Sequence, residues 1–238
     1  MTTREIFQNE PYARNCAAVV GSINTELSAF SVDQTVFYPL GGGQLGDQGL
    51  ATAHSGERFE IIDTRRGRDS GQILHFCSPD SPLPNIGTNV TMELDWERRY
   101  RLMRMHSCMH LLCALIPAQV TGGQIYPDRG RLDFDLDQTV DKVQLQQSLN
   151  RVIFNGSKRD VKWITEEQLD RNPKLVRTMS VEPPRGNGSV RLVHFQGVDL
   201  QPCGGTHVAI SSEIGPVRVE KVEKKGRKNR RITIVFDE

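Results

Sequence analysis

Four residues with the chemistry of metal ligands occur in two tight pairs. His106 and His110 are four residues apart in RMHSCMHLL, and Cys203 and His207 are four residues apart in QPCGGTH. Three imidazoles and one thiolate suit a tetrahedral zinc ion. Residues four apart on a helix share one face, and the two glycines between Cys203 and His207 let the backbone turn tightly. The sequence therefore predicts a Zn²⁺ site formed by these four residues.

The spacing of the four residues does not decide whether such an ion is structural or catalytic. If all four residues bind at once, the site is closed and structural, whereas release of one ligand lets the ion bind water or substrate. Ser107 follows His106 where a metalloprotease helix has glutamate, so the motif carries no general base of its own. Cys113 lies on the histidine stripe and is an alternative soft ligand, although a buried free cysteine usually packs as a small apolar residue.

The elements that must position these residues change type along the chain. Up to about residue 95, short runs rich in branched and aromatic residues alternate with glycine, proline and polar turns, as in a small barrel or sandwich. The predicted strands are CAAVVGS, SVDQTVFYPL, ERFEIIDT, GQILHF and NVTMELDW.

From Trp96 the pattern becomes helical and ends at Pro117. An apolar stripe at spacings of 3, 4, 3 and 4 defines one helix face: Leu102, Met105, Met109, Leu112 and Ile116. His106 and His110 are displaced by one residue from this stripe, so we expect them at the rim of the buried face, within reach of a cleft.

The remainder of the chain mixes helices and strands. Helices are predicted over about 139–155 and from Thr165 to before Pro173, and strands over 131–136 and 189–196. The last forty residues predict a hairpin of PVRVEKVE with RRITIVFD. The predicted fold class is α+β, with an N-terminal all-β domain, a barrel or sandwich, over 1–92 and a zinc-binding domain of helices and strands over 93–238.

Composition restricts the class of protein. The chain has 238 residues, 37% of them hydrophobic and 25% charged, and no apolar run long enough to span a bilayer. We expect a cytoplasmic protein without a membrane partner, because the N-terminus lacks a signal peptide and five irregularly spaced cysteines form no disulfide framework. A net charge of +1 leaves any nucleic-acid contact to local basic patches.

These residues resemble a known family. HSCMHLL and CGGTH are similar to the HxxxH and CxxxH zinc motifs of the editing domain of alanyl-tRNA synthetase and of its free-standing AlaX relatives. DQTVFYPLGGGQLGDQG resembles the D-x-T-x-F-Y-P-x-G-G-G-Q stretch of the synthetase and the longer AlaX proteins. Ser107 departs mildly from the threonine common there. Because no aminoacylation domain precedes the barrel-like segment, the resemblance implies a trans-acting editor of the medium-length type.

The resemblance implies that the N-terminal domain is a small, translation-factor-like β-barrel and that the second is an α+β two-layer editing domain with a zinc site. It also implies an activity. The expected reaction is zinc-dependent, ATP-independent hydrolysis of the ester joining serine, and secondarily glycine, to the tRNA for alanine, which would protect translation fidelity. By position, Thr35 and Gln44 would face the aminoacyl group, and Gly41, Gly42 and Gly43 would let backbone approach it. The resemblance implies no protein partner.

Other residues are candidates for orienting water or contacting tRNA, and each of them also has a simpler explanation. Asp133 and Asp135 share a face of RLDFDL and could orient water, or could be solvent-facing carboxylates. Basic residues could contact tRNA phosphates or be only a solvated surface: Lys224, Lys225, Arg227 and Lys228 on the hairpin, and Arg98 and Arg99 at the start of the first helix. The alternative functions are an editor of the threonyl type and a non-catalytic, zinc-stabilised RNA-binding module.

Overall fold

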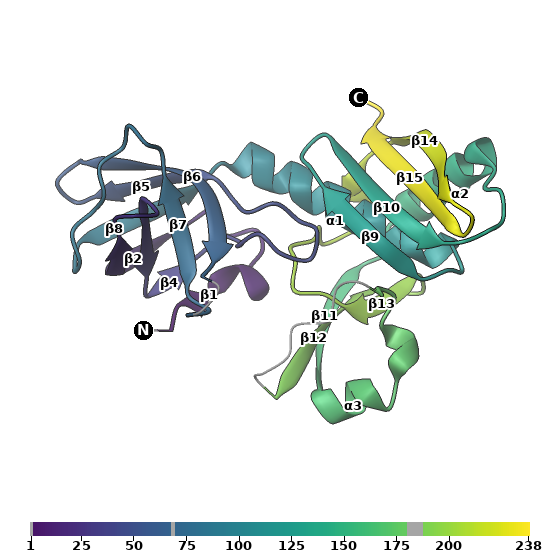
Figure 1. The fold of residues 1–238 in the computed structure, drawn as a ribbon, viewed down its shortest axis with the longest axis horizontal. Coiled ribbons are helices and arrows are strands. Elements are labelled where there is room, and N and C mark those ends of the chain that lie inside the picture. Colours follow the sequence, from purple (N-terminus) through teal and green to yellow (C-terminus); the bar gives the residue numbers. More distant parts are fainter. Residues whose placement is uncertain (1, 68–69, 180–187) are drawn as a thin grey trace. The chain divides into compact units, whose positions relative to one another are not determined.

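The computed structural model describes residues 2–67, 70–179 and 188–238, which form strands and helices in two compact units (Figure 1). The first unit comprises Met1–Gly41 and Leu45–Tyr100, and the second comprises Gly42–Gln44 and Arg101–Glu238. The division differs from the 92/93 boundary expected from sequence. The start of the first long helix belongs to the first unit, and three residues of the glycine-rich segment belong to the second.

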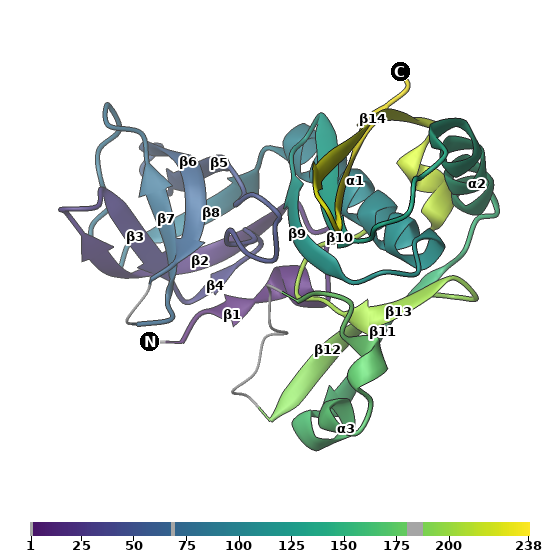
Figure 2. The same cartoon turned by 45° about the vertical axis from the view of Figure 1, so that its right-hand side comes forward.

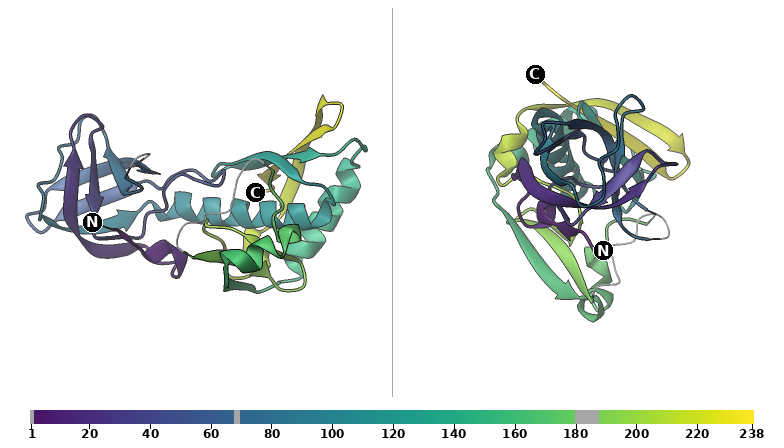
Figure 3. Two further views of the ribbon diagram at one scale, coloured as in Figure 1. Left: turned by 60° about the horizontal axis from the view of Figure 1, so that its bottom comes forward. Right: turned by 90° about the vertical axis from the view of Figure 1, so that its left-hand side faces the viewer.

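The first unit contains a closed barrel of six strands, which confirms the predicted barrel (Figure 3). Its strands, in barrel order, are β2 (Asn15–Asn24), β3 (Ala29–Val32), β7 (Ile73–Cys77), β6 (Arg58–Arg66), β5 (Gly49–Ala53) and β8 (Asn89–Leu94). Alternation of apolar and polar residues decides which side chains enter it, as in β8, where Val90, Met92 and Leu94 are buried and the residues between them are exposed. Phe30 and Phe59 are completely buried in the same core.

The segment SVDQTVFYPL is not one strand as predicted. It is interrupted after β3 by Asp33, whose carboxylate accepts hydrogen bonds from the backbone N–H groups of Val19, at 2.7 Å, and Gln34, at 2.9 Å. The short strand β4 (Gln34–Thr35) then pairs in parallel with β1 (Arg4–Glu5), which leads into the 3₁₀ turn Ile6–Gln8. A side-chain acceptor that competes for backbone donors thus ends the strand early.

Arg99 is a buried structural residue, so its prediction as a tRNA contact is wrong. Its side chain is 0% exposed, and its Nε donates to Asp47 Oδ2 at 2.8 Å. Other guanidinium nitrogens donate to the same carboxylate oxygen and to the backbone carbonyls of Pro11 and Val36. The charge therefore serves to hold together segments of the first unit that are far apart in the sequence.

The second unit has a four-stranded antiparallel sheet in the order β14-β15-β10-β9. These strands are β14 (Val217–Gly226), β15 (Asn229–Phe236), β10 (Arg129–Asp135) and β9 (Val120–Ile125), and β14 with β15 confirms the predicted C-terminal hairpin. Helix α2 (Lys142–Phe154) begins at Asp141, whose carboxylate caps two backbone N–H groups, and lies beside β14 (Figure 2).

A smaller antiparallel sheet completes the second unit, in the order β11 (Arg159–Thr165), β12 (Ser189–Phe195) and β13 (Asp199–Pro202). Thr165 and Gln168 form the predicted capping box of α3 (Glu166–Asp170). Among the described residues, 3₁₀ turns follow at Pro173–Leu175 and Ser211–Ile214. No helix among the described residues is both long and apolar enough to cross a membrane.

Helix α1 (Trp96–Leu115) belongs to the second unit from Arg101 onward. The helix packs so closely on β10 that a Cβ atom at Gly130 would lie only 2.8 Å from Met109 Sδ. His106 is 5% exposed and His110 is 4% exposed. The expectation that they border the buried face is therefore wrong, since this part of the helix is covered on nearly all sides.

We predict that Arg99→Met lowers the free energy of unfolding of the first unit by about 3–5 kcal/mol, because it leaves the Asp47 carboxylate buried without its partner. Urea denaturation of the purified protein measures the effect. Arg65→Met is the matched control, because Arg65 forms an ion pair with Asp63 while 56% exposed, and such a pair contributes about 1 kcal/mol or less. Equal stability of the two variants would contradict the assignment.

Candidate metal centre

Four donor atoms converge in the second unit, from the two pairs found in the sequence. One ligand atom from each of His106, His110, Cys203 and His207 lies within 4.8 Å of all the others. Cys203 Sγ is 3.5 Å from His106 Nε2 and 3.7 Å from His207 Nε2, and the Nε2 atoms of His207 and His110 are 3.1 Å apart. Zinc bonds of about 2.0–2.3 Å in a tetrahedron require donors roughly 3.3–3.8 Å apart. The arrangement fits a zinc ion, and we call it the metal-ligand cluster.

The two halves of the cluster come from a helix and a loop. His106 and His110 occupy successive turns of α1, and Cys203 and His207 lie in the loop that follows β13. A Cβ atom at Gly205 would lie 2.3 Å from His106 Cε1, so only glycine lets this loop reach the helix. Ser107 Oγ fixes the end of the loop by accepting a hydrogen bond from the Val208 N–H at 3.1 Å.

An outer layer of hydrogen bonds orients two of the imidazoles. His110 Nδ1 lies 3.0 Å from Asp199 Oδ2, and because a carboxylate only accepts, this nitrogen carries the proton. Gln201 Nε2 donates to the same oxygen at 2.9 Å. His106 Nδ1 lies 2.8 Å from Gln44 Oε1. Both imidazoles therefore direct Nε2 toward the cluster, as metal-binding histidines do when a second partner holds Nδ1–H.

The charges of these groups are strongly coupled. Burial raises the pKa of the Cys203 thiol, but the nearby imidazoles of His106 and His207 outweigh burial and hold that pKa well below its usual value. The Gly205 N–H also points to the sulfur, at 3.4 Å. Burial lowers the pKa of His110, yet hydrogen bonds to Asp199 and Cys203 outweigh it and raise the value to about 9. The protein thus stabilises a thiolate beside a cation, and a metal ion can replace that proton.

Thr35 lies in the barrel unit with its hydroxyl already hydrogen bonded. Its side chain is 0% exposed, and Oγ1 accepts from the Phe37 N–H at 3.0 Å and lies 3.0 Å from His75 Nε2. Burial lowers the pKa of His75 to about 4, so the ring is neutral, and its Nδ1 faces the Phe30 carbonyl at 3.3 Å. Nδ1 therefore carries the ring proton, Nε2 accepts from the Thr35 hydroxyl, and one Thr35 lone pair is left over.

The glycine-rich segment is shaped by its backbone. Gly42 and Gly43 have φ of 57° and 83°, a region that favours glycine, and the Gly43 carbonyl accepts from the Ile125 N–H at 2.8 Å. A Cβ atom at Gly43 would lie 3.1 Å from the Gly123 carbonyl oxygen. At Gly41 a Cβ atom would make only ordinary contacts. In this structure the glycine-rich segment therefore makes its close backbone contact with β9.

The two candidate water-orienting carboxylates differ in their surroundings. Asp133 accepts two hydrogen bonds of 2.7 Å from Arg231, and this interaction lowers its pKa. Asp135 is exposed at the end of β10. Asp133 is therefore committed to an ion pair between β10 and β15.

The predicted basic residues of the hairpin are exposed, whereas Arg98 and Arg99 are not. Lys224, Lys225, Arg227 and Lys228 are all exposed at the turn of the β14–β15 hairpin. Arg98 is half-buried and donates to the Gly46 carbonyl at 2.7 Å.

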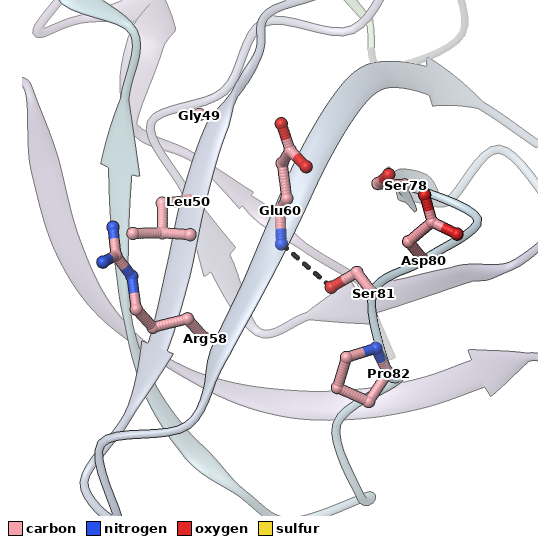
Figure 4. A pocket seen from close by; sticks show the side chains of 8 residues that line it. All are labelled: Gly49, Leu50, Arg58, Glu60, Ser78, Asp80, Ser81 and Pro82. Carbon is pink, nitrogen blue, oxygen red and sulfur yellow. Dashed lines mark hydrogen bonds between the residues drawn. The ribbon is translucent and has the colours of Figure 1, made fainter.

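A hollow of about 500 Å³ lies on the barrel (Figure 4). In it the backbone N–H of Glu60 donates to Ser81 Oγ at 3.1 Å. None of the residues predicted from sequence to form a site lines this hollow, which is bordered by Gly49, Leu50, Arg58, Glu60, Ser78, Asp80, Ser81 and Pro82.

Several residues around the cluster were not predicted from the sequence. Asp199 and Gln201 lie on a four-residue strand with no pattern that marks them. Thr206 is inside CGGTH and could have been identified as a neighbour of His207. In the barrel unit, His75 and its partner Thr35 are forty residues apart, so no local spacing marks that pair either.

Comparisons with known proteins agree with these features. The family described as "Threonyl and Alanyl tRNA synthetase second additional domain" matches residues 190–233, which include Cys203 and His207. The family described as "tRNA synthetases class II (A)" matches residues 15–98.

Individual relatives extend the similarity over nearly the whole chain. The present chain is 31% identical over 234 residues to the alanyl-tRNA editing protein AlaX-M of Saccharolobus solfataricus, with 97% of each chain covered. AlaX-M of Methanosarcina acetivorans is 33% identical over 245 residues, again with 97% of each chain covered. An alanine–tRNA ligase of Saccharolobus islandicus is 32% identical over 232 residues, which are 93% of this chain and 25% of the ligase. The chain therefore belongs to the AlaX-M family of alanyl-tRNA editing proteins.

Proposed function

We propose that this protein is a zinc-dependent hydrolase of mischarged tRNA for alanine. The bond cleaved is the ester between the tRNA and a wrong amino acid, chiefly serine and secondarily glycine, and no ATP is needed because the ester is already activated. The observation that carries the proposal is the convergence of four donor atoms at zinc-like separations, in a chain that matches AlaX-M proteins over 97% of its length.

The residues that would hold zinc are His106, His110, Cys203 and His207. When bound, the ion would polarise the ester carbonyl or lower the pKa of a water molecule, either directly or after one ligand is released. The protein groups supply the rest. Gln44 and Asp199 hold two imidazoles in the tautomer that offers Nε2, and the Gly205 N–H stabilises the Cys203 thiolate.

Discrimination between serine and alanine would depend on one hydroxyl group. A site whose polar groups are left unpaired by alanine can reject it by up to about 10⁴–10⁵-fold. We propose that Thr35 contributes its one remaining lone pair as an acceptor for the serine hydroxyl or the α-ammonium group. The glycine-rich segment Gly41–Gly43 would allow backbone close to the substrate.

We predict that metal-replete protein releases serine rapidly from alanine tRNA, releases glycine more slowly, and leaves alanine attached. A chelator should abolish the activity, and zinc should restore it. Release of each radiolabelled amino acid from charged tRNA measures the rates. Cys203→Ala should lose both zinc and activity, whereas Cys77→Ala, which removes a buried thiol of the barrel, is the matched control.

The outcomes separate the competing functions. Absence of hydrolysis by metal-replete protein would contradict the proposed hydrolase activity and favour a zinc-stabilised RNA-binding module. Hydrolysis of serine from the tRNA for threonine, and not from that for alanine, would favour the threonyl type. Retention of zinc and activity by Cys203→Ala would remove that residue from the site.

Binding of tRNA is proposed to use the exposed turn of the C-terminal hairpin. Lys224, Lys225, Arg227 and Lys228 lie within five residues on the chain and are all exposed. Cationic side chains that neutralise phosphates release counterions, so binding weakens steeply with salt.

We predict that replacing these four residues with alanine weakens binding of the tRNA and reduces the slope of log K against log salt by about 3–4, since each phosphate contact contributes close to one unit. A filter-binding titration at several salt concentrations measures both quantities. Replacement of Arg4, Arg58, Lys174 and Arg218 removes the same charge elsewhere and serves as the control. An unchanged slope in the hairpin variant would contradict the proposal.

A further inference from the structure

Gln44 has a place in the structure that its position in the glycine-rich segment does not suggest. Its side chain is 1% exposed, and Oε1 lies 2.8 Å from His106 Nδ1 and 3.2 Å from the Thr206 N–H. Its Nε2 lies 2.9 Å from Thr206 Oγ1. A residue 62 positions before His106 is thus bonded both to a metal ligand and to the neighbour of another, His207.

The hydrogen bonds determine which way the amide of Gln44 points. A backbone N–H can only donate, so the atom of Gln44 that faces Thr206 N is the oxygen. The same oxygen faces His106 Nδ1, which must therefore carry a proton. His106 then presents the lone pair of Nε2 to Cys203 and the rest of the cluster, the form required of a metal ligand.

The contacts leave Gln44 little capacity to bind anything else. Both lone pairs of Oε1 are used, one by His106 and one by the Thr206 N–H, and one of the two amide hydrogens is used by the Thr206 hydroxyl. The loop also covers the side chain, since a Cβ atom at Gly205 would lie 2.9 Å from Oε1. No acceptor on this side chain remains for a serine hydroxyl.

We infer that Gln44 is a positioning residue that fixes the tautomer and orientation of His106, and that it does not contact the aminoacyl group. The inference rests on the proposed function, because it requires that His106 binds zinc. Asp199 acts in the same way on His110. In the described part of the chain His207 Nδ1 is buried with no hydrogen-bond partner, so only the two helix histidines have this support.

Metal affinity tests the inference independently of editing. Zinc affinity is measured by competition with a chromogenic chelator, and ligand geometry by the visible absorption of the cobalt-substituted protein. Gln44→Ala should weaken zinc binding by about 10- to 100-fold, as loss of such a partner does elsewhere, and should change the cobalt spectrum. Gln48→Ala removes a partly buried glutamine of the same segment, whose Nε2 donates to the Ile62 carbonyl and not to the cluster, and it should do neither.

Gln44→Glu distinguishes positioning from a loss of packing. A carboxylate accepts from His106 Nδ1–H and the Thr206 N–H as the amide oxygen does, and its second oxygen accepts from the Thr206 hydroxyl. This variant should keep zinc affinity and the cobalt spectrum close to those of the unmodified protein, and it carries the test if Gln44→Ala does not fold.

The results separate this inference from the proposed function. Unchanged zinc affinity and cobalt spectrum in Gln44→Ala, together with a raised KM for serine-charged tRNA, would overturn the positioning role and leave the editing proposal standing. Loss of zinc affinity in Gln44→Glu equal to that in Gln44→Ala would also overturn it. An unmodified protein that binds neither zinc nor cobalt would contradict both.

Discussion

The mutual approach of four donor atoms is the constraint on which the second unit depends. Lone pairs of three imidazoles and a thiolate repel one another when they are brought to 3.1–3.7 Å in a buried place, unless a cation lies among them. Among the protein groups themselves, a proton on His110 reduces this repulsion, since the pKa of His110 is raised to about 9 while that of Cys203 is held well below its usual value. A divalent metal ion meets the same requirement more fully and releases the proton.

Two features of the fold maintain this arrangement against the repulsion. The chain reaches close to α1 only because Gly205 has no side chain, and it stays there because Ser107, on the helix, accepts from the backbone of the loop. Gln44 and Asp199 then orient the rings from outside the cluster. The glycine-rich segment and the CGGTH loop, 162 residues apart, are thereby parts of one hydrogen-bonded structure.

Local patterns predicted the residues of the metal-ligand cluster, most strands of the first unit, the long helix and the C-terminal hairpin, because spacing within a few residues determines each of them. The choice of a barrel over a sandwich came from the family resemblance. Long-range partners had no such signal, so Asp199 and the link from Gln44 to Thr206 were missed. Arg98 and Arg99 form one charge run in the sequence, and only burial against Asp47 separates their roles. The histidines were expected at a rim because they are displaced by one residue from the apolar stripe of the helix. In the structure the helix is covered beyond that stripe as well. Arg104, for example, packs 4.3 Å from the Phe236 ring centroid and donates to the Ile214 carbonyl.

The coordination of the metal is the most direct test of the proposed zinc site. X-ray absorption at the zinc edge of the purified protein, combined with elemental analysis, gives the number and type of ligands. We expect one zinc per chain, with three nitrogen ligands at about 2.0–2.1 Å and one sulfur at about 2.3 Å, or one of the nitrogens replaced by oxygen if a ligand is exchanged for water. A protein without zinc, or a zinc shell without sulfur, would contradict it.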